Sequence, residues 1–165
     1  MVDVANVMGS RPDGWWRDRA GAAVRLYSEL AALAASGRAI LPGPTGPRDA
    51  GQPPDAAGPP DIVMVLEGAA RAAATRITSA ETARGQQSET AGGQPAIPTG
   101  PGQAQPGRVR VVEARGSGDD AIVALARELP GRRVVVTADR VLRDRSVAAG
   151  AAVLGPAWLL ALLRQ

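Results

Sequence analysis

Acidic side chains recur at the ends of the strands that the sequence predicts. Asp3 lies in the apolar segment at the start of the chain and Glu67 ends a second apolar run, while Asp119 and Asp120 open a helix and Asp139 follows three valines. Ligands of open parallel sheets bind outside the carboxyl ends of the strands, so we expect these acids at one edge. Carboxylates about 5 Å apart repel by roughly 3 kcal/mol at an effective dielectric near 20. A cation is therefore expected among them, and a set of oxygen ligands favours Mg²⁺ or Mn²⁺.

Helix capping is the alternative explanation for each acid taken alone. Asp119, Asp120 and Asp139 would then accept hydrogen bonds from free backbone N–H groups at helix starts. Glu67 would be the polar end of a strand entering a loop. Asp3 is harder to explain in this way, because a carboxylate inside an apolar strand needs a partner. An acid at each of four strand ends favours a shared site over capping alone.

The composition excludes several other kinds of site. The 165 residues include no histidine and no cysteine, and all 19 cations are arginine. These absences exclude a Ser-His-Asp triad, a thiol nucleophile and the usual zinc ligands. The lack of lysine excludes a Schiff base and a Walker-type phosphate loop. Carboxylates, hydroxyls, arginine and a hard metal remain for any chemistry.

The charge distribution suits an anionic polymer. The formal net charge is only +3, but setting aside the five acids named above leaves 19 cations against 11 acids. A basic surface around a small acidic centre fits a nucleic acid approaching a metal site. The alternative is that the arginine content reflects genomic composition.

Strands alternate with helices along the chain, which predicts an α/β fold with a doubly wound parallel sheet in a three-layer α/β/α sandwich. The strands are expected at 1–8, 61–67, 108–114, 132–138 and 151–155, and the helices at 18–36, 119–129, 139–150 and 156–165. Residues 41–60 are rich in proline and residues 68–107 are of low complexity, so we expect two flexible insertions in a single domain spanning 1–165. A marginal helix over 71–84 is the alternative within the second insertion.

The sequence predicts a soluble, cytoplasmic protein with no membrane partner. The start lacks the basic segment and long apolar run of a signal peptide. The apolar run at 157–163 is far shorter than the roughly 20 residues that span a bilayer. The absence of cysteine fits a reducing compartment.

Five segments together resemble the NYN domain, and more narrowly its YacP-like branch within the PIN-like ribonuclease superfamily. They are VDVAN at 2–6, GSRPDGWWRDRAGA at 9–22, VLEG at 65–68, GSGDDAI at 116–122 and VVVTADR at 134–140. The resemblance spans both ends of the chain and skips only the two insertions. It implies the α/β fold, divalent metal binding by the acidic cluster, and cleavage of RNA.

The resemblance also implies roles for single residues. Asp3, Asp119 and Asp139 would be the metal ligands, with Glu67 completing the catalytic acids directly or through water. Asp120 ranks below its neighbour as a ligand. In support, Asn6 would hold Asp3 or a phosphate oxygen, and Thr137 would orient a carboxylate or a water; a plain strand-end threonine is the alternative for Thr137.

Basic and aromatic residues near the first motif are candidates for binding substrate. Arg11 and Trp15, together with Arg140 beyond the last motif, would contact phosphate and stack on bases. The alternatives are that at least one of the two adjacent tryptophans fills the core and that Arg140 belongs to a solvated helix face.

The expected function is that of a metal-dependent ribonuclease using Mg²⁺ or Mn²⁺, with RNA as its partner, including tRNA, mRNA or the ribosome. The alternative is a non-catalytic RNA-binding or ribosome-associated module of the same fold. It is motivated by the short first strand and by Glu67, where the family usually has aspartate. A phosphatase with an aspartyl nucleophile is disfavoured, since the first strand has no D-x-D and the chain has no lysine.

Overall fold

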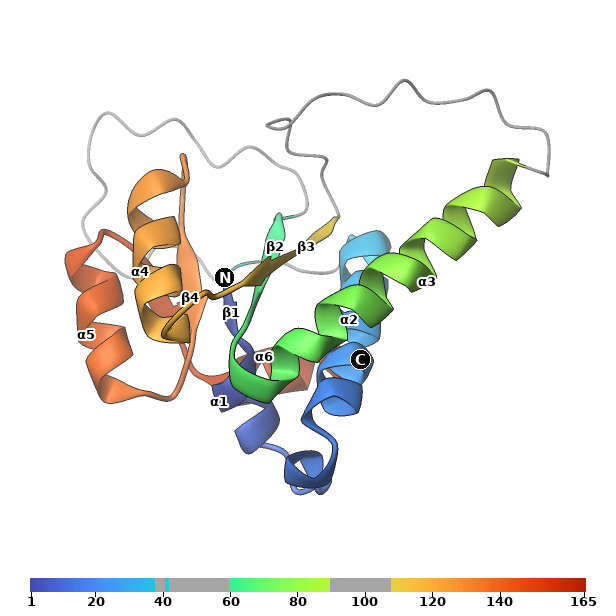
Figure 1. Ribbon diagram of the computed structural model, residues 1–165. Coiled ribbons are helices and arrows are strands. Elements are labelled where there is room, and N and C mark those ends of the chain that lie inside the picture. The colour runs from blue at the N-terminus through green and yellow to red at the C-terminus, as the bar shows by residue number, and fades with distance from the viewer. Residues whose placement is uncertain (38–40, 42–59, 90–107) are drawn as a thin grey trace.

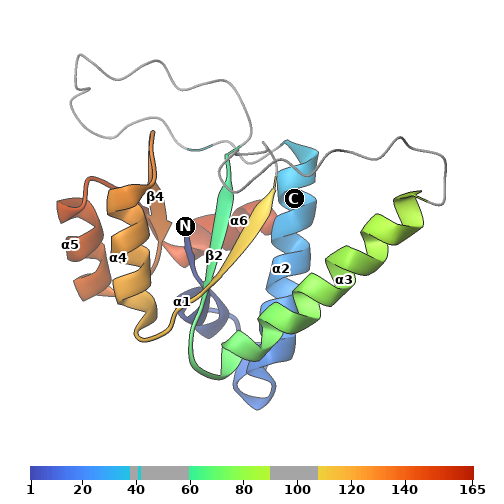
Figure 2. The same ribbon diagram turned by 45° about the horizontal axis from the view of Figure 1, so that its top comes forward.

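The core of the protein is a five-stranded sheet in the order β3-β2-β1-β4-β5, with every neighbouring pair parallel. The computed structural model describes residues 1–37, 41, 60–89 and 108–165. The strands are β1 (Val2–Asp3), β2 (Ile62–Leu66), β3 (Val109–Glu113), β4 (Val134–Val136) and β5 (Ala152–Leu154). Figure 2 shows the start of the chain between β2 and β4, so the shortest strand holds the centre of the sheet. The α/β class and the parallel sheet are confirmed.

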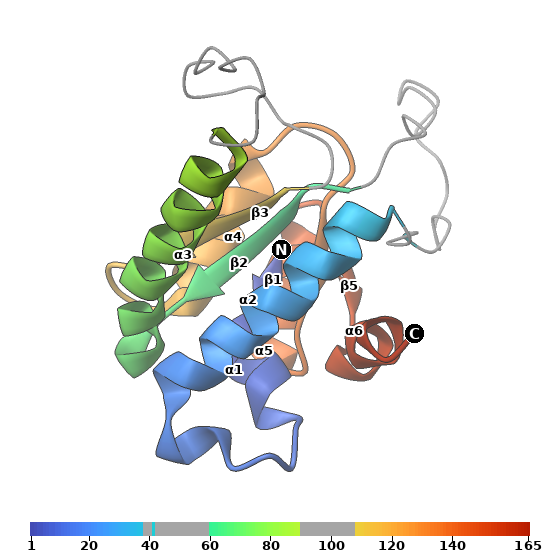
Figure 3. The same ribbon diagram turned by 90° about the vertical axis from the view of Figure 1, so that its right-hand side faces the viewer.

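Helices cover both faces of this sheet. They are α1 (Val4–Gly9), α2 (Arg19–Ser36), α3 (Ala72–Glu89), α4 (Gly118–Glu128), α5 (Arg140–Ala148) and α6 (Pro156–Leu163), with 3-10 turns η1 (Trp15–Arg17) and η2 (Gly68–Arg71). Figure 3 shows α1, α2, α3 and α6 in front of the sheet and α4 and α5 behind it. The carboxyl ends of β1, β2 and β4 point toward the lower edge of Figure 1, where α1 and α3 begin.

The two faces of the sheet form two apolar cores. In β2 the side chains of Ile62, Met64 and Leu66 enter the core beneath α2 and α3, and Val63 and Val65 enter the core beneath α4 and α5. All five residues are buried, as expected for a parallel strand covered on both sides. The continuous apolar run that predicted β2 therefore reflects burial on two faces.

The first strand is shorter than the expected span of 1–8, because α1 begins at Val4. The Asp3 side chain accepts a hydrogen bond from the backbone N–H of Asn6 and so acts as the N-cap of this helix. Val4 and Val7 are buried there, so packing outweighs the preference of valine for strands. The prediction of a single strand over residues 1–8 was thus wrong.

The second insertion was also wrongly placed in part, since 68–71 form η2 and 72–89 form α3. The alanine content that looked like low complexity is strongly helix-forming. Ala70, Ala73 and Ile77 are buried against the core that α2 shares, which gives the helix its tertiary support. The remainder of this insertion, and nearly all of 41–60, lies outside the described residues.

The other predicted helices and strands are confirmed, with boundaries that shift by no more than two residues. Within the described part of the chain, no helix combines the length and apolar character needed to cross a membrane.

Replacing Ile77 with alanine tests whether α3 is an integral part of the fold. Its side chain is 2 % exposed in the core between α3 and α2. We expect Ile77→Ala to lower the free energy of unfolding by about 2–4 kcal/mol, because it leaves a cavity. The neighbouring Arg76 is exposed, and Arg76→Ala is expected to change stability by less than about 0.5 kcal/mol. Equal stability of the two variants in urea denaturation would contradict the packed helix.

Candidate active site

Asp3 lies at the carboxyl end of the central strand, and its side chain is buried, with 6 % of the residue exposed. Its Oδ1 accepts a hydrogen bond from the backbone N–H of Asn6 at 3.1 Å, and its Oδ2 accepts one from Asn6 Nδ2 at 2.7 Å. The Thr137 hydroxyl donates a third bond to Oδ2 at 2.8 Å. These three donors compensate the cost of burying a carboxylate. The predicted contact of Asn6 with Asp3 is confirmed.

Thr137 links the ends of β1 and β4. It is fully buried, and its hydroxyl accepts a hydrogen bond from the backbone N–H of Asp139 at 3.1 Å while donating to Asp3. One hydroxyl therefore sets the position of two predicted metal ligands from neighbouring strands. The structure therefore brings Thr137 into contact with a carboxylate, as the sequence predicted.

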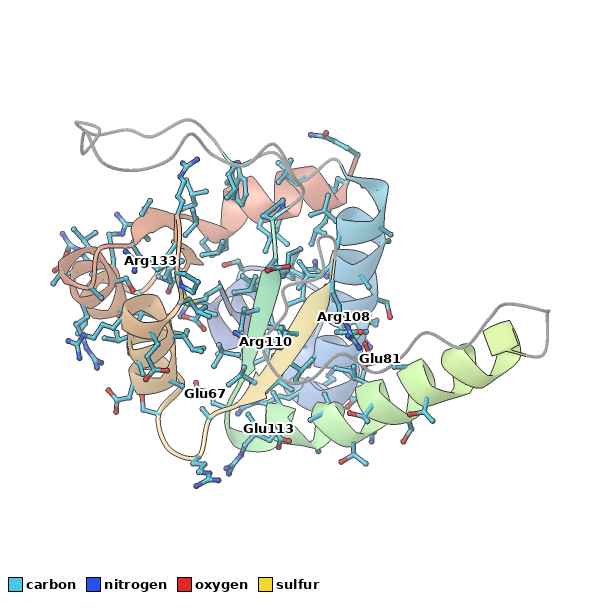
Figure 4. The ribbon with its side chains drawn as sticks, turned by 90° about the horizontal axis from the view of Figure 1, so that it is seen from above. Glu67, Glu81, Arg108, Arg110, Glu113 and Arg133 are labelled. Carbon is cyan, nitrogen blue, oxygen red and sulfur yellow. The ribbon has the colours of Figure 1, made fainter. Side chains whose placement is uncertain are left out.

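Asp139 and Glu67 each bind the start of a helix. Asp139 Oδ1 accepts a hydrogen bond from Leu142 N at 2.8 Å and caps α5, as the capping alternative predicted. Glu67 Oε2 accepts a hydrogen bond from Gly118 N at 2.7 Å, although Glu67 follows β2 and lies 51 residues before Gly118 in the chain. Figure 4 shows Glu67 beside the loop that leads from β3 to α4. Both carboxylates are thus oriented by backbone N–H groups, and each keeps a second oxygen for which the described residues provide no hydrogen bond.

Asp119 is the acid whose pKa is affected by the charges of the other acids. Its pKa is raised above the ordinary value of 3.8, first by desolvation and then by the negative charges of Asp3, Asp139 and Glu67. The positive charge of Arg145 acts in the opposite direction. Neither a hydrogen bond nor an ion pair is found for the Asp119 carboxylate within the described part of the chain. Asp119 therefore does not cap α4, and the four acids form one electrostatic cluster.

The side chains do not already form a coordination shell. Among the residues described, no three acidic groups are arranged closely enough to hold a metal ion. The donor set nevertheless fits a hard cation, because it consists of carboxylate oxygens and a threonine hydroxyl. The mutual repulsion at Asp119 is the kind of strain that a bound cation relieves.

Asp120 turns away from this cluster. Its Oδ1 forms an ion pair with Arg145 NH2 at 2.5 Å, and its side chain is 70 % exposed. The lower rank given to Asp120 as a ligand agrees with this position on the outer face of α4.

An open cavity of about 370 Å³ lies beside the acids, and Glu67 forms part of its wall. The lining residues are Ala5, Met8, Trp15, Arg19, Glu67, Gly68, Ala70, Arg71 and Gly116. The Arg19 guanidinium carbon lies 5.4 Å from the centre of the Trp15 ring, within the range of a cation–π contact. This cavity therefore combines an aromatic ring, two cations and one acid at the carboxyl edge of the sheet.

The three predicted substrate-binding residues have different surroundings. Trp15 lines the cavity while also packing on the core, whereas its neighbour Trp16 is 57 % exposed. Arg11 instead forms two hydrogen bonds with the Glu29 carboxylate on α2, at 3.1 and 2.5 Å, and does not line the cavity. Arg140 is exposed at the start of α5 and has no ion pair among the described residues.

Arg71 is the cavity residue that sequence reasoning missed. It was assigned to the flexible insertion because the surrounding alanines looked like low complexity. Its position four residues after Glu67, in EGAAR, was the available signal. One helical turn after Glu67 brings a cation back to the same edge, provided that the segment is helical.

Replacing Thr137 with valine tests the link between β1 and β4. Valine keeps the shape but lacks the hydroxyl, so Asp3 loses one of its donors and the amide of Asp139 loses its acceptor. We expect Thr137→Val to lower the free energy of unfolding by about 1–3 kcal/mol in urea denaturation. Thr137→Ser keeps the hydroxyl and removes only a methyl group, so its loss should be about 1 kcal/mol. A valine variant as stable as the wild type would show that the bond contributes nothing.

The raised pKa of Asp119 predicts that its charge lowers the stability of the fold to an extent that depends on pH. A folded-state pKa above the unfolded one means that folding favours the protonated form, so stability falls as the pH rises through the raised pKa. Asp119→Asn removes this cost and should raise the melting temperature by roughly 2 °C at pH 7 but not near pH 3. Asp120→Asn, in the same helical turn but paired with Arg145, should give no such gain. A lower melting temperature for Asp119→Asn at pH 7 would contradict the cluster.

Comparison of the chain with protein-family models, with curated proteins and with solved structures finds no match. The resemblance to the NYN family therefore rests on the motif residues themselves. The function has to be argued from those residues and from the geometry of the acidic edge.

Proposed function

We propose that the protein is a metal-dependent ribonuclease of the NYN and PIN-like type, in the YacP-like branch, that acts on RNA in the cytoplasm. The observation that carries the proposal is the position of Asp3, Glu67, Asp119 and Asp139 at or beyond the carboxyl ends of β1, β2, β3 and β4, with the pKa of Asp119 raised by desolvation and by the charges of the other three. Four acids from four different strand ends share one edge of a parallel sheet, where ligands of such folds bind. Capping accounts for the hydrogen bonds of Asp139, but it leaves Asp119 unexplained.

In this proposal Asp3, Asp119 and Asp139 hold Mg²⁺ or Mn²⁺, and Glu67 completes the acidic set directly or through water. The cation supplies two effects when bound: a lower pKa for an attacking water and neutralisation of charge on the scissile phosphate. Asn6 and Thr137 hold Asp3 in place, because together they donate three hydrogen bonds to its carboxylate. Such support of ligands by outer partners is a general feature of metal sites.

The protein residues around the acids suit an RNA backbone. Arg140 follows Asp139 directly and is exposed without an ion pair in the described part of the chain, so it is available to a phosphate. The proposed chemistry needs no histidine, thiol or covalent intermediate, in agreement with the composition. The family resemblance implies products with a 5′-phosphate and a 3′-hydroxyl, with tRNA, mRNA or ribosomal RNA among the candidate targets.

A second candidate is a non-catalytic RNA-binding or ribosome-associated module of the same fold. The observation that favours it is the state of the acids, since both oxygens of Asp3 accept hydrogen bonds and Glu67 is bound to the start of α4. Such a module would bind RNA equally well with and without divalent cations.

Metal-dependent cleavage of single-stranded RNA distinguishes the two candidates. The sharpest comparison is between Asp119→Asn and Asp120→Asn, because the two acids are adjacent and only Asp119 belongs to the cluster. With Mn²⁺ present, we expect Asp119→Asn to cleave about 100-fold or more slowly than the wild type, the usual scale for losing transition-state charge stabilisation. Asp120→Asn should stay within about threefold, because its exposed ion pair contributes little.

Asp119→Asn is more informative than Asp139→Asn, since Asp139 also caps α5 and its loss would alter the fold. Melting curves of each variant provide the folding control. Equal cleavage by the wild type and Asp119→Asn would refute the assignment. RNA binding without cleavage, unchanged by chelation of metal, would establish the second candidate.

A further inference from the structure

We propose that the cavity beside the acidic edge binds one nucleoside monophosphate unit, with its base against Trp15 and its phosphate at Arg71 and Arg19. The inference rests on the proposed ribonuclease function and identifies where a single unpaired nucleotide of the substrate lies. The cavity has a volume of about 370 Å³, near the lower end of the 300–1,000 Å³ typical of ligand sites. That space suits one nucleotide and not a stacked base pair.

The position of the cavity ties it to the acids. Glu67 is a member of the electrostatic cluster and also part of the cavity wall, together with Gly68 and Gly116 from the loops after β2 and β3. A nucleotide in the cavity would therefore be adjacent to the edge where Asp119 lies. In the proposed ribonuclease, the occupant would therefore lie next to the phosphodiester bond that is cleaved.

The two arginines of the cavity differ from Arg11 and Arg145, which are paired with acids. Arg11 is paired with Glu29 and Arg145 with Asp120. Arg19 and Arg71 have no carboxylate partner within the described residues, so their charges remain available. A guanidinium without an acid partner in a concave wall is suited to a phosphate, which it binds through charge-assisted hydrogen bonds.

Arg71 is held in place by backbone groups. Its Nε donates to the Gly68 carbonyl at 3.4 Å and its NH1 to the Ala114 carbonyl at 3.3 Å. These contacts span the two loops that border the cavity and leave NH2 without a hydrogen bond among the described residues. The guanidinium is thus oriented without being neutralised, which lowers the entropic cost of binding an anion.

The rest of the lining suits a flat apolar ring. Trp15 is packed on the core and therefore rigid, and Ala5, Met8 and Ala70 add small or flexible apolar surface. The Arg19 guanidinium carbon lies 5.4 Å from the centre of the Trp15 ring, so these two residues form adjacent parts of the cavity wall. Stacking of a base on an aromatic side chain contributes about 1–3 kcal/mol and tolerates any base.

Calorimetric titration with adenosine 5′-monophosphate, adenosine and inorganic phosphate tests the cavity directly. The full-length protein is kept in a chelator, so that no cleavage or metal binding contributes. We expect the monophosphate to bind more tightly than either of its parts, and Arg71→Gln to weaken it about tenfold, the scale of one charge-assisted hydrogen bond. Arg19→Gln is expected to act in the same direction.

Arg127→Gln is the matched control, because it removes the same charge from an exposed position. Arg127 lies near the end of α4, about 13 Å along the helix axis from Gly118 at the acidic edge. Arg127→Gln should change the affinity for adenosine 5′-monophosphate by less than about twofold, as expected for a distant exposed charge. Arg71→Gln and Arg127→Gln have the same net charge, so a difference between them reports position alone.

A second experiment tests whether the cavity takes a unit of an RNA strand or a free nucleotide. Binding of a labelled single-stranded oligoribonucleotide is measured by fluorescence anisotropy at several salt concentrations. If the site receives a unit of an RNA strand, Arg71→Gln weakens RNA binding and lowers the salt slope by about 1 relative to Arg127→Gln. Adenosine 5′-monophosphate then competes with the RNA. Loss of monophosphate binding with unchanged RNA binding would assign the cavity to a free nucleotide and overturn the substrate role.

The two proposals fail in different ways. Equal affinities of Arg71→Gln and Arg127→Gln for the monophosphate and for RNA would overturn the cavity assignment and leave metal-dependent cleavage intact. Arg71-dependent binding in a wild-type protein that does not cleave RNA would refute the ribonuclease and retain the nucleotide site. In an active enzyme, Arg71→Gln should raise KM with little change in kcat, because it removes a contact that binds substrate and transition state equally.

Discussion

The hydrogen bond from Thr137 to Asp3 is the interaction on which the acidic edge depends. β1 has only two residues, yet it is the central strand and pairs with both β2 and β4. A buried carboxylate at its end would oppose folding unless donors reached it, and the Thr137 hydroxyl and the Asn6 amides supply them. Because the same hydroxyl accepts the amide of Asp139, one polar contact aligns two strands and two acids. The architecture of the sheet and the geometry of the site therefore share a cause.

Helix capping does not exclude the proposed metal site in this molecule. Asp3 caps α1, Asp139 caps α5 and Glu67 binds the start of α4, so three acids stabilise helices while their charges lie at one edge. Each is oriented by backbone N–H groups that do not depend on a ligand. Asp119 has no such partner in the described part of the chain, and its pKa is raised by burial and by the other three. The ionised Asp119 carboxylate therefore lowers the stability of the fold. Residues that do so are candidates for a functional role, because function commonly opposes stability at such positions.

Local patterns predicted most of this fold because the chain alternates cleanly between buried strands and amphipathic helices. They failed where tertiary packing decides the outcome. α1 follows Asp3 because of a capping bond, and α3 forms because Ala73 and Ile77 pack beside α2. The acids were predictable from their places at strand ends, since parallel topology gathers those ends. The pairing of Arg11 with Glu29 was not, because it brings a loop residue onto α2. The contact of Arg71 with the Ala114 carbonyl was not either, because it joins segments that are 43 residues apart.

Glu67 shows how a side chain longer than aspartate is accommodated at the end of β2. Its carboxylate reaches the start of α4 and accepts the Gly118 N–H at 2.7 Å. A Cβ at position 118 would lie 2.7 Å from Glu67 Oε2, so a larger residue there would displace the carboxylate from this position. Gly118 therefore leaves room for the Glu67 carboxylate at the start of α4. The contact engages Oε2, so Oε1 is the oxygen that this acid offers to a cation or to the adjoining cavity.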